Sequence, residues 1–171
     1  MNTSQIHLAL NHVPLFLSIV GGLILLYGFI KRADPLKFLS LHFMIAAALF
    51  IIPVYLTGEG AEEVVEGLPG ISESLIEKHE ETARVGSIVT MIAGIVSLST
   101  LVIRKNPALL KLSLVLCAFL SFISFGIMGQ TAHLGGQIRH YELRHGAASP
   151  TENKNGNSEG DETKKEAKDD D

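Results

Sequence analysis

Histidine is the residue type in this chain whose positions point most clearly to chemistry. Seven histidines are present among 171 residues. A neutral imidazole can bind the iron of haem, and it also suits zinc and copper. The single cysteine, Cys117, excludes an internal disulfide, and no C-x-x-C-H sequence is present for covalent attachment of a c-type haem. Any haem would therefore be held non-covalently, through histidine.

Long stretches without charged residues supply the helices that would position these histidines. Four such stretches occur, at residues 1–30, 38–58, 85–103 and 112–138. A helix needs about 20 apolar residues to cross a bilayer, and short connections make neighbouring helices antiparallel. The sequence therefore predicts an all-α integral membrane protein, an antiparallel four-helix bundle. The expected helices lie near residues 6–30, 38–57, 72–103 and 110–140.

The charges between these stretches predict how the bundle lies in the membrane. Basic residues gather in the first and third connections: Lys31, Arg32, Lys37, Arg104, Lys105 and Lys111. The second connection instead carries eight glutamates between Glu59 and Glu81. Cytoplasmic connections are enriched in Lys and Arg. We therefore expect a multi-pass protein of the bacterial inner membrane, with both termini and the acidic connection in the periplasm.

The last 26 residues differ in composition from the rest of the chain. Residues 146–171 contain no Ile, Leu, Val, Phe, Tyr or Met, and their 4 basic and 8 acidic residues account for the whole net charge of −4. Such a segment cannot bury enough apolar surface to offset the entropy of ordering. We expect residues 1–145 to form the membrane domain and 146–171 to be a disordered acidic tail. The negative charge also argues against nucleic-acid binding.

Six histidines lie at or beyond the predicted periplasmic ends of the helices: His7, His12, His79, His133, His140 and His145. The rise of a helix places three of them, on three different helices, about 32 to 36 Å above the cytoplasmic turns, and His12 about 27 Å above them. His42 lies only about 6 Å above these turns and cannot join the others. This arrangement predicts a ligand cluster of His7, His12, His79 and His133 at the periplasmic rim.

The expected depths favour His7 opposite His79 and His12 opposite His133. Each pair could supply the two axial nitrogens of a haem b, so one or two haems are expected. Small residues lie below three of these histidines on the same helical faces, and they would either admit a flat cofactor or pack helices closely. Arg84 and Arg139 could pair with haem propionates or extend to the membrane surface.

Short motifs around these histidines resemble a bacterial family of predicted four-span membrane proteins of unknown function. Residues 6–15, I-H-L-A-L-N-H-V-P-L, resemble the family's H-P-x-x-x-H-F-P opening, with Leu8 in place of the first proline. His79 would open the third span, and T-A-H-L-G-G at residues 131–136 would end the fourth. R-H-G at residues 144–146 resembles a further mark, but its longer spacing leaves His140 and His145 unassigned. The resemblance covers about residues 5–146 and implies a four-span fold, with the histidine positions suggesting a b-type cytochrome.

The sequence favours an electron carrier over an enzyme. Two protein ligands leave no open position on the iron, and no hydrolase arrangement is visible. A quinol or a periplasmic cytochrome c would be the partner, and the oligomeric state is left open. Two alternatives remain at this point: a periplasm-facing protein that binds zinc, copper or iron as a sensor or transport accessory, and a non-catalytic subunit of a membrane complex.

Overall fold

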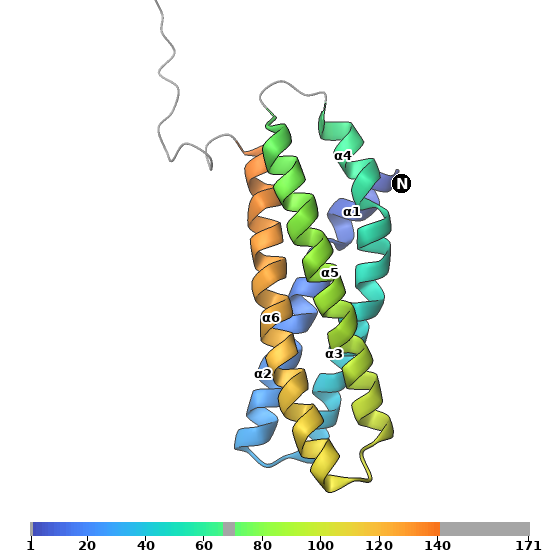
Figure 1. The fold of residues 1–171 in the computed structure, drawn as a ribbon, viewed down its shortest axis with the longest axis vertical. Helices are drawn as coiled ribbons and strands as arrows, with labels where there is room; N and C mark the ends of the chain where they lie inside the picture. The colour runs from blue at the N-terminus through green and yellow to red at the C-terminus, as the bar shows by residue number, and fades with distance from the viewer. Residues whose placement is uncertain (1, 67–70, 141–171) are drawn as a thin grey trace, which may run out of the picture.

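The computed structural model describes residues 2–66 and 71–140. The predicted acidic tail and His145 lie outside the described residues. The described residues form six helices: α1 (Thr3–Leu10), α2 (Val13–Ile30), α3 (Asp34–Leu56), α4 (Gly58–Glu66), α5 (Glu73–Val102) and α6 (Pro107–Arg139) (Figure 1). Over the described ranges the chain contains no strand. The predicted all-α class is confirmed.

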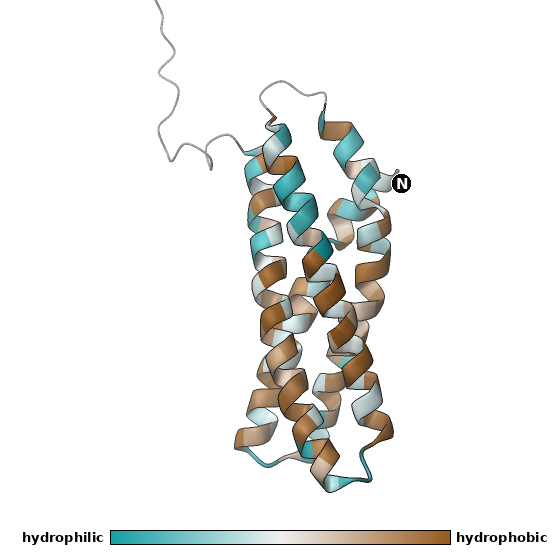
Figure 2. Ribbon diagram, viewed as in Figure 1, coloured by the Kyte–Doolittle hydropathy of each residue, from teal (hydrophilic) through white to brown (hydrophobic). Residues whose placement is uncertain are grey.

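Four segments of the structure are long and apolar enough to cross a membrane. They are α1 with α2, α3 with α4, α5, and α6. The long helices form a ring in which α2 packs on α3 and α6, while α5 packs on α3 and α6 (Figure 1). Most of the bundle's length is covered by apolar residues, whereas polar residues gather toward the end that holds α4 and the start of α5 (Figure 2). The structure is thus the expected antiparallel four-helix bundle.

The two ends of the bundle carry opposite charge. We call the end that holds α1, α4 and the start of α5 the acidic end, and the end with the turns at residues 31–33 and 103–106 the basic end. Proline in the first turn of α3 and of α6 fixes the backbone where each helix leaves a basic turn. Asn106 also caps α6 by accepting a hydrogen bond from the backbone of Leu109. These local signals make both turns short, so the neighbouring helices run antiparallel.

The first predicted helix is broken in the structure. One helix was expected over residues 6–30, but α1 ends at Leu10 and α2 begins at Val13. Pro14 lies in the first turn of α2 and has no N–H group to donate to the carbonyl of Leu10. The short α1 instead packs against α3 and α4. His7 therefore does not share a continuous helical face with Pro14, contrary to the sequence-based expectation.

Hydroxyl groups and small residues fill the interior between the helices. The Oγ atom of Ser124 lies 3.1 Å from Ser18 Oγ and 2.6 Å from Thr90 Oγ1, which joins α6 to α2 and α5. Gly94 of α5 packs against Ala48 of α3. Gly126 and Gly129, by contrast, have no atom within 4 Å of where a Cβ would lie. The small residues of α5 therefore serve close packing, whereas those below His133 face open space.

Candidate functional site

His7 is held by the contact between α1 and α3. Its Nδ1 atom lies 3.0 Å from the backbone oxygen of Val54, and the ring is half-buried. A carbonyl oxygen can only accept a hydrogen bond, so Nδ1 carries the proton and donates it. Val54 belongs to the last turn of α3, and its carbonyl also accepts a hydrogen bond from the hydroxyl of Thr57, at 3.2 Å. In the neutral ring, Nε2 then presents its lone pair.

His79 is held in the same way by the contact between α5 and α6. Its Nδ1 atom lies 2.9 Å from the backbone oxygen of Thr131, and this ring is also half-buried. The carbonyl again requires the proton to be on Nδ1. Both imidazoles therefore adopt the tautomer in which Nε2 is the nitrogen available to a ligand.

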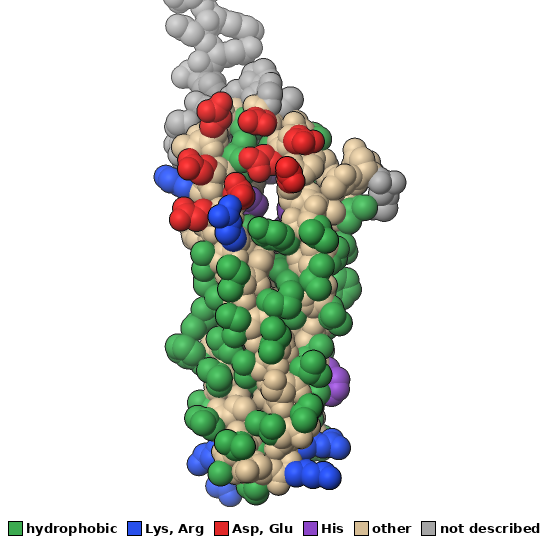
Figure 3. Space-filling view, turned by 45° about the vertical axis from the view of Figure 1, so that its right-hand side comes forward, with side chains coloured by type: hydrophobic (Ala, Val, Ile, Leu, Met, Phe, Trp, Pro, Cys, Tyr) green, Lys and Arg blue, Asp and Glu red, His purple; other side chains and the backbone are tan. Residues whose placement is uncertain are grey.

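The two anchored imidazoles belong to opposite sides of the acidic end. His7 lies on the side made by α1, α3 and α4, and His79 lies on the side made by α5 and α6. Figure 3 shows histidine side chains inside the opening between these two sides, below a group of carboxylates. His7 and His79 thus belong to the same end of the bundle, and the predicted pairing of the two rings stays a prediction.

His12 and His133 have different surroundings. Both side chains are exposed. His12 bonds through Nδ1 to the side-chain oxygen of its neighbour Asn11. His133 Nε2 lies 3.0 Å from Gln137 Nε2, one turn further along α6, and accepts the amide hydrogen. Each ring therefore bonds within its own segment, and the predicted pairing of His12 with His133 stays a prediction.

Three further residues that bear on the prediction, His42, Arg84 and Arg139, lie on α3, α5 and α6 respectively. His42 is exposed and bonds to the backbone oxygen of Phe38 on its own helix, at 2.8 Å. Arg84 is exposed, bonds to Glu80 at 2.9 Å, and interacts with the side chain of Tyr55 on α3. Arg139 ends α6, and its side chain lies outside the described part of the structure. The propionate contacts expected for Arg84 and Arg139 stay predictions.

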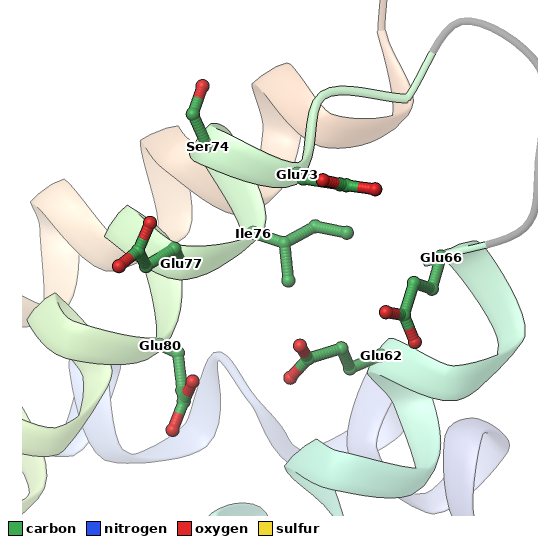
Figure 4. Close-up of a pocket in the computed structure, with 7 residues that line it drawn as sticks. All are labelled: Glu62, Glu66, Glu73, Ser74, Ile76, Glu77 and Glu80. Carbon is green, nitrogen blue, oxygen red and sulfur yellow. The ribbon is translucent and has the colours of Figure 1, made fainter.

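A cavity of about 470 Å³ opens between α4 and the first turns of α5 (Figure 4). Five carboxylates dominate its lining, which consists of Glu62, Glu66, Glu73, Ser74, Ile76, Glu77 and Glu80. Glu62 and Glu80 extend into it from opposite helices (Figure 4). The carboxylates of Glu59, Glu66 and Glu80 also repel that of Glu62. The approach to the histidine pair from this side is therefore strongly negative.

Within residues 2–66 and 71–140, no group of three or more His, Cys, Asp or Glu side chains is placed to hold a metal ion. A structural zinc site usually needs four ligands, and a catalytic site needs three protein ligands. Haem iron, by comparison, can be held by two histidines.

Comparisons with protein families, curated proteins and solved structures found no match for this chain. The family resemblance of the sequence motifs therefore stays a prediction. The function proposed below therefore rests on the chemistry of His7 and His79.

Sequence reasoning missed the groups that orient the histidine pair. The acceptors are backbone carbonyls of Val54 and Thr131, and a carbonyl leaves no mark in the residue type. Two signals were nevertheless present in the sequence. A glycine follows each acceptor residue by four positions, and Pro14 indicates a helix break, which allows α1 to pack against α3.

Proposed function

We propose that this chain is a membrane electron-transfer protein that binds one non-covalent haem b between His7 and His79. The supporting observation is that both rings donate Nδ1–H to a backbone carbonyl, at 3.0 and 2.9 Å, and so keep Nε2 for a ligand. Metal-bound histidines almost always donate their second ring nitrogen to a carbonyl, a carboxylate or water in this way. The two rings would then hold the iron of the haem from the two sides of the acidic end, one from α1 and one from α5.

The charges around the pair bear on how a haem would fit. The carboxylates of the cavity above the histidines repel the propionates of a haem, so the cavity itself is an unsuitable place for them. Arg84 lies at the same end beside Tyr55 and could neutralise a propionate, although it already forms an ion pair with Glu80. We therefore assign the iron ligands to His7 and His79, and a propionate contact to Arg84.

The proposed role follows from the number of protein ligands. A haem bound here would supply one-electron chemistry. Because His7 and His79 would both hold the iron, the protein would relay electrons rather than activate a small molecule. The chain's own contribution is to hold both rings in one tautomer and to keep them half-buried. A quinol or a periplasmic cytochrome is the proposed partner, with the acidic end in the periplasm of a bacterial inner membrane.

Absorption spectroscopy tests this proposal directly. The full chain, expressed with an adequate haem supply and purified in detergent, should show a Soret band and a sharp α-band after reduction. The variants His7→Ala and His79→Ala should each lose or shift these bands, because each removes one axial ligand. His42→Ala is the matched control, since His42 is exposed and bonds only within its own helix.

Variants of His12 and His133 distinguish the binding of one haem from the binding of two. If a single haem binds between His7 and His79, the variants His12→Ala and His133→Ala should keep the wild-type spectrum and haem content. A colourless wild-type preparation would overturn the proposal, and metal analysis of that sample would then test the metal-binding alternative. Unchanged bands in both the His7 and His79 variants would reject the assignment of the ligands.

A further inference from the structure

A glycine lies beside each anchored imidazole, four residues after the carbonyl that holds it. Gly58 follows Val54 by four positions and is near His7, and Gly135 follows Thr131 by four positions and is near His79. The two sides of the acidic end thus repeat one local arrangement: a carbonyl that accepts Nδ1–H, and a residue without a side chain against the ring.

The two glycines differ in how closely the ring approaches. A Cβ atom at Gly135 would lie 3.1 Å from Cε1 and 3.4 Å from Nδ1 of His79. A Cβ atom at Gly58 would lie 3.8 and 4.0 Å from the same atoms of His7, which is ordinary van der Waals contact. A Cβ atom would therefore crowd only the His79 ring, which would have to shift by a few tenths of an ångström while it bonds to Thr131.

Gly135 has no other contact in the described structure that would require a glycine. The only atoms within 4 Å of its missing Cβ belong to His79. It lies inside α6, where glycine is a poorer helix former than alanine. Gly86 and Gly94, by comparison, face Met128 and Ala48 on neighbouring helices, so they serve helix packing.

We propose that Gly135 is a positioning residue for His79: it lets the ring lie against α6 and donate Nδ1–H to Thr131, which keeps Nε2 directed to the ligand. His7 is not crowded in this way, because a Cβ atom at Gly58 would lie at ordinary van der Waals distance from its ring.

The hydrogen bond from His79 to Thr131 and the contact with Gly135 are features of the protein alone. The identity of the ligand at Nε2, by contrast, rests on the proposed function. The first measurement therefore needs no haem. Nitrogen-15 spectra of the histidine-labelled full chain in detergent report whether Nδ1 or Nε2 carries the proton, and the His79→Gln variant assigns the His79 signals. We expect a hydrogen-bonded Nδ1–H on His79 in the wild type, and its loss in Gly135→Ala and Gly135→Val, with the larger effect for valine.

Two matched variants separate positioning from general effects on the helix. Gly129→Ala changes another glycine of α6, one with open space around it, and Gly58→Ala changes the equivalent position beside His7. Both should leave the His79 signal unchanged. A His79 Nδ1–H signal in Gly135→Val that equals the wild-type signal would overturn the inference, and so would an equal loss in Gly129→Ala.

A haem titration of the same proteins then tests the link to function. Groups that orient a metal-bound histidine typically change metal affinity by about 10- to 100-fold. We expect haem binding to Gly135→Val to weaken by about tenfold or more. If the wild type binds no haem while Gly135→Val loses the nitrogen-15 signal, the proposed function fails and the positioning role stands. If the wild type binds haem and Gly135→Val binds it equally well, the positioning role fails.

Discussion

At the scale of single residues, Ser124 links three helices inside the bundle. Its hydroxyl bonds to Ser18 at 3.1 Å and to Thr90 at 2.6 Å, and all three side chains are buried. Replacing Ser124 with Ala leaves Ser18 without this partner, while Thr90 keeps its bond to the backbone of Gly86. We expect Ser124→Ala to destabilise the protein by about 0.6 to 1.7 kcal/mol, the range for hydrogen bonds between membrane helices.

Thermal unfolding in detergent measures this effect. Ser99→Ala is the matched control, because Ser99 is exposed and bonds only to Ile95 of its own helix. It should change the melting temperature little. A Ser124→Ala protein that is as stable as Ser99→Ala would show that the buried hydroxyl network contributes nothing measurable to stability.

The sequence also shows how far residue-scale features can be foreseen. Residue counting predicted similar depths for His7 and His79, because helical rise is regular. Counting could not predict the tautomer, since it depends on backbone carbonyls that come within reach only after the helices pack. His12 and His133 have the same residue type and similar depth, yet each bonds within its own segment. Counting positions could not distinguish these two from the anchored pair.

At the scale of elements, the break between α1 and α2 decides where His7 lies. Pro14 withholds the hydrogen bond that would continue α1 into α2. We expect Pro14→Ala to favour a continuous helix, which would draw α1 away from α3 and remove His7 from the Val54 carbonyl. The nitrogen-15 signal of His7 Nδ1–H should weaken, the signal of His79 should persist, and haem binding should decrease.

Pro35→Ala is the control for this change. Pro35 also lies in the first turn of a helix, α3, but at the basic end and far along the chain from the site. Its replacement should leave both histidine signals intact. If Pro14→Ala retains the wild-type His7 signal, the break does not depend on proline and must be held by the packing of α1 on α3 and α4.

The positions of the long helices could be predicted more fully than the interruption between α1 and α2. Runs of apolar residues mark α2, α3, α5 and α6, because a membrane helix must be apolar over about 20 residues. The sequence also placed the start of the third helix near Ser72, and α5 begins at Glu73. A helical period carried through Pro14 gave the wrong face for His7, because hydropathy alone does not show where an apolar helix is interrupted.

At the scale of the whole molecule, charge divides the bundle along its long axis. Basic residues occupy one end, and the carboxylates of α4 and α5 occupy the other, beside the histidine pair (Figure 3). Electron transfer with a soluble partner would then be assisted by a basic surface on that partner, because complementary charge raises the rate of encounter. The proposed function therefore requires the acidic end to be the end that such a partner can reach.

This requirement predicts the topology, which single added cysteines can measure. Cys117 is fully buried, so the wild type should not react with a membrane-impermeant maleimide and serves as the control. Glu63→Cys and Lys105→Cys place exposed thiols at the acidic and basic ends respectively. In right-side-out vesicles from a bacterial host we expect Glu63→Cys to react at once and Lys105→Cys only after permeabilisation, because basic turns are retained in the cytoplasm. The opposite pattern would place the histidine pair on the cytoplasmic side, and a periplasmic cytochrome could then not be its partner.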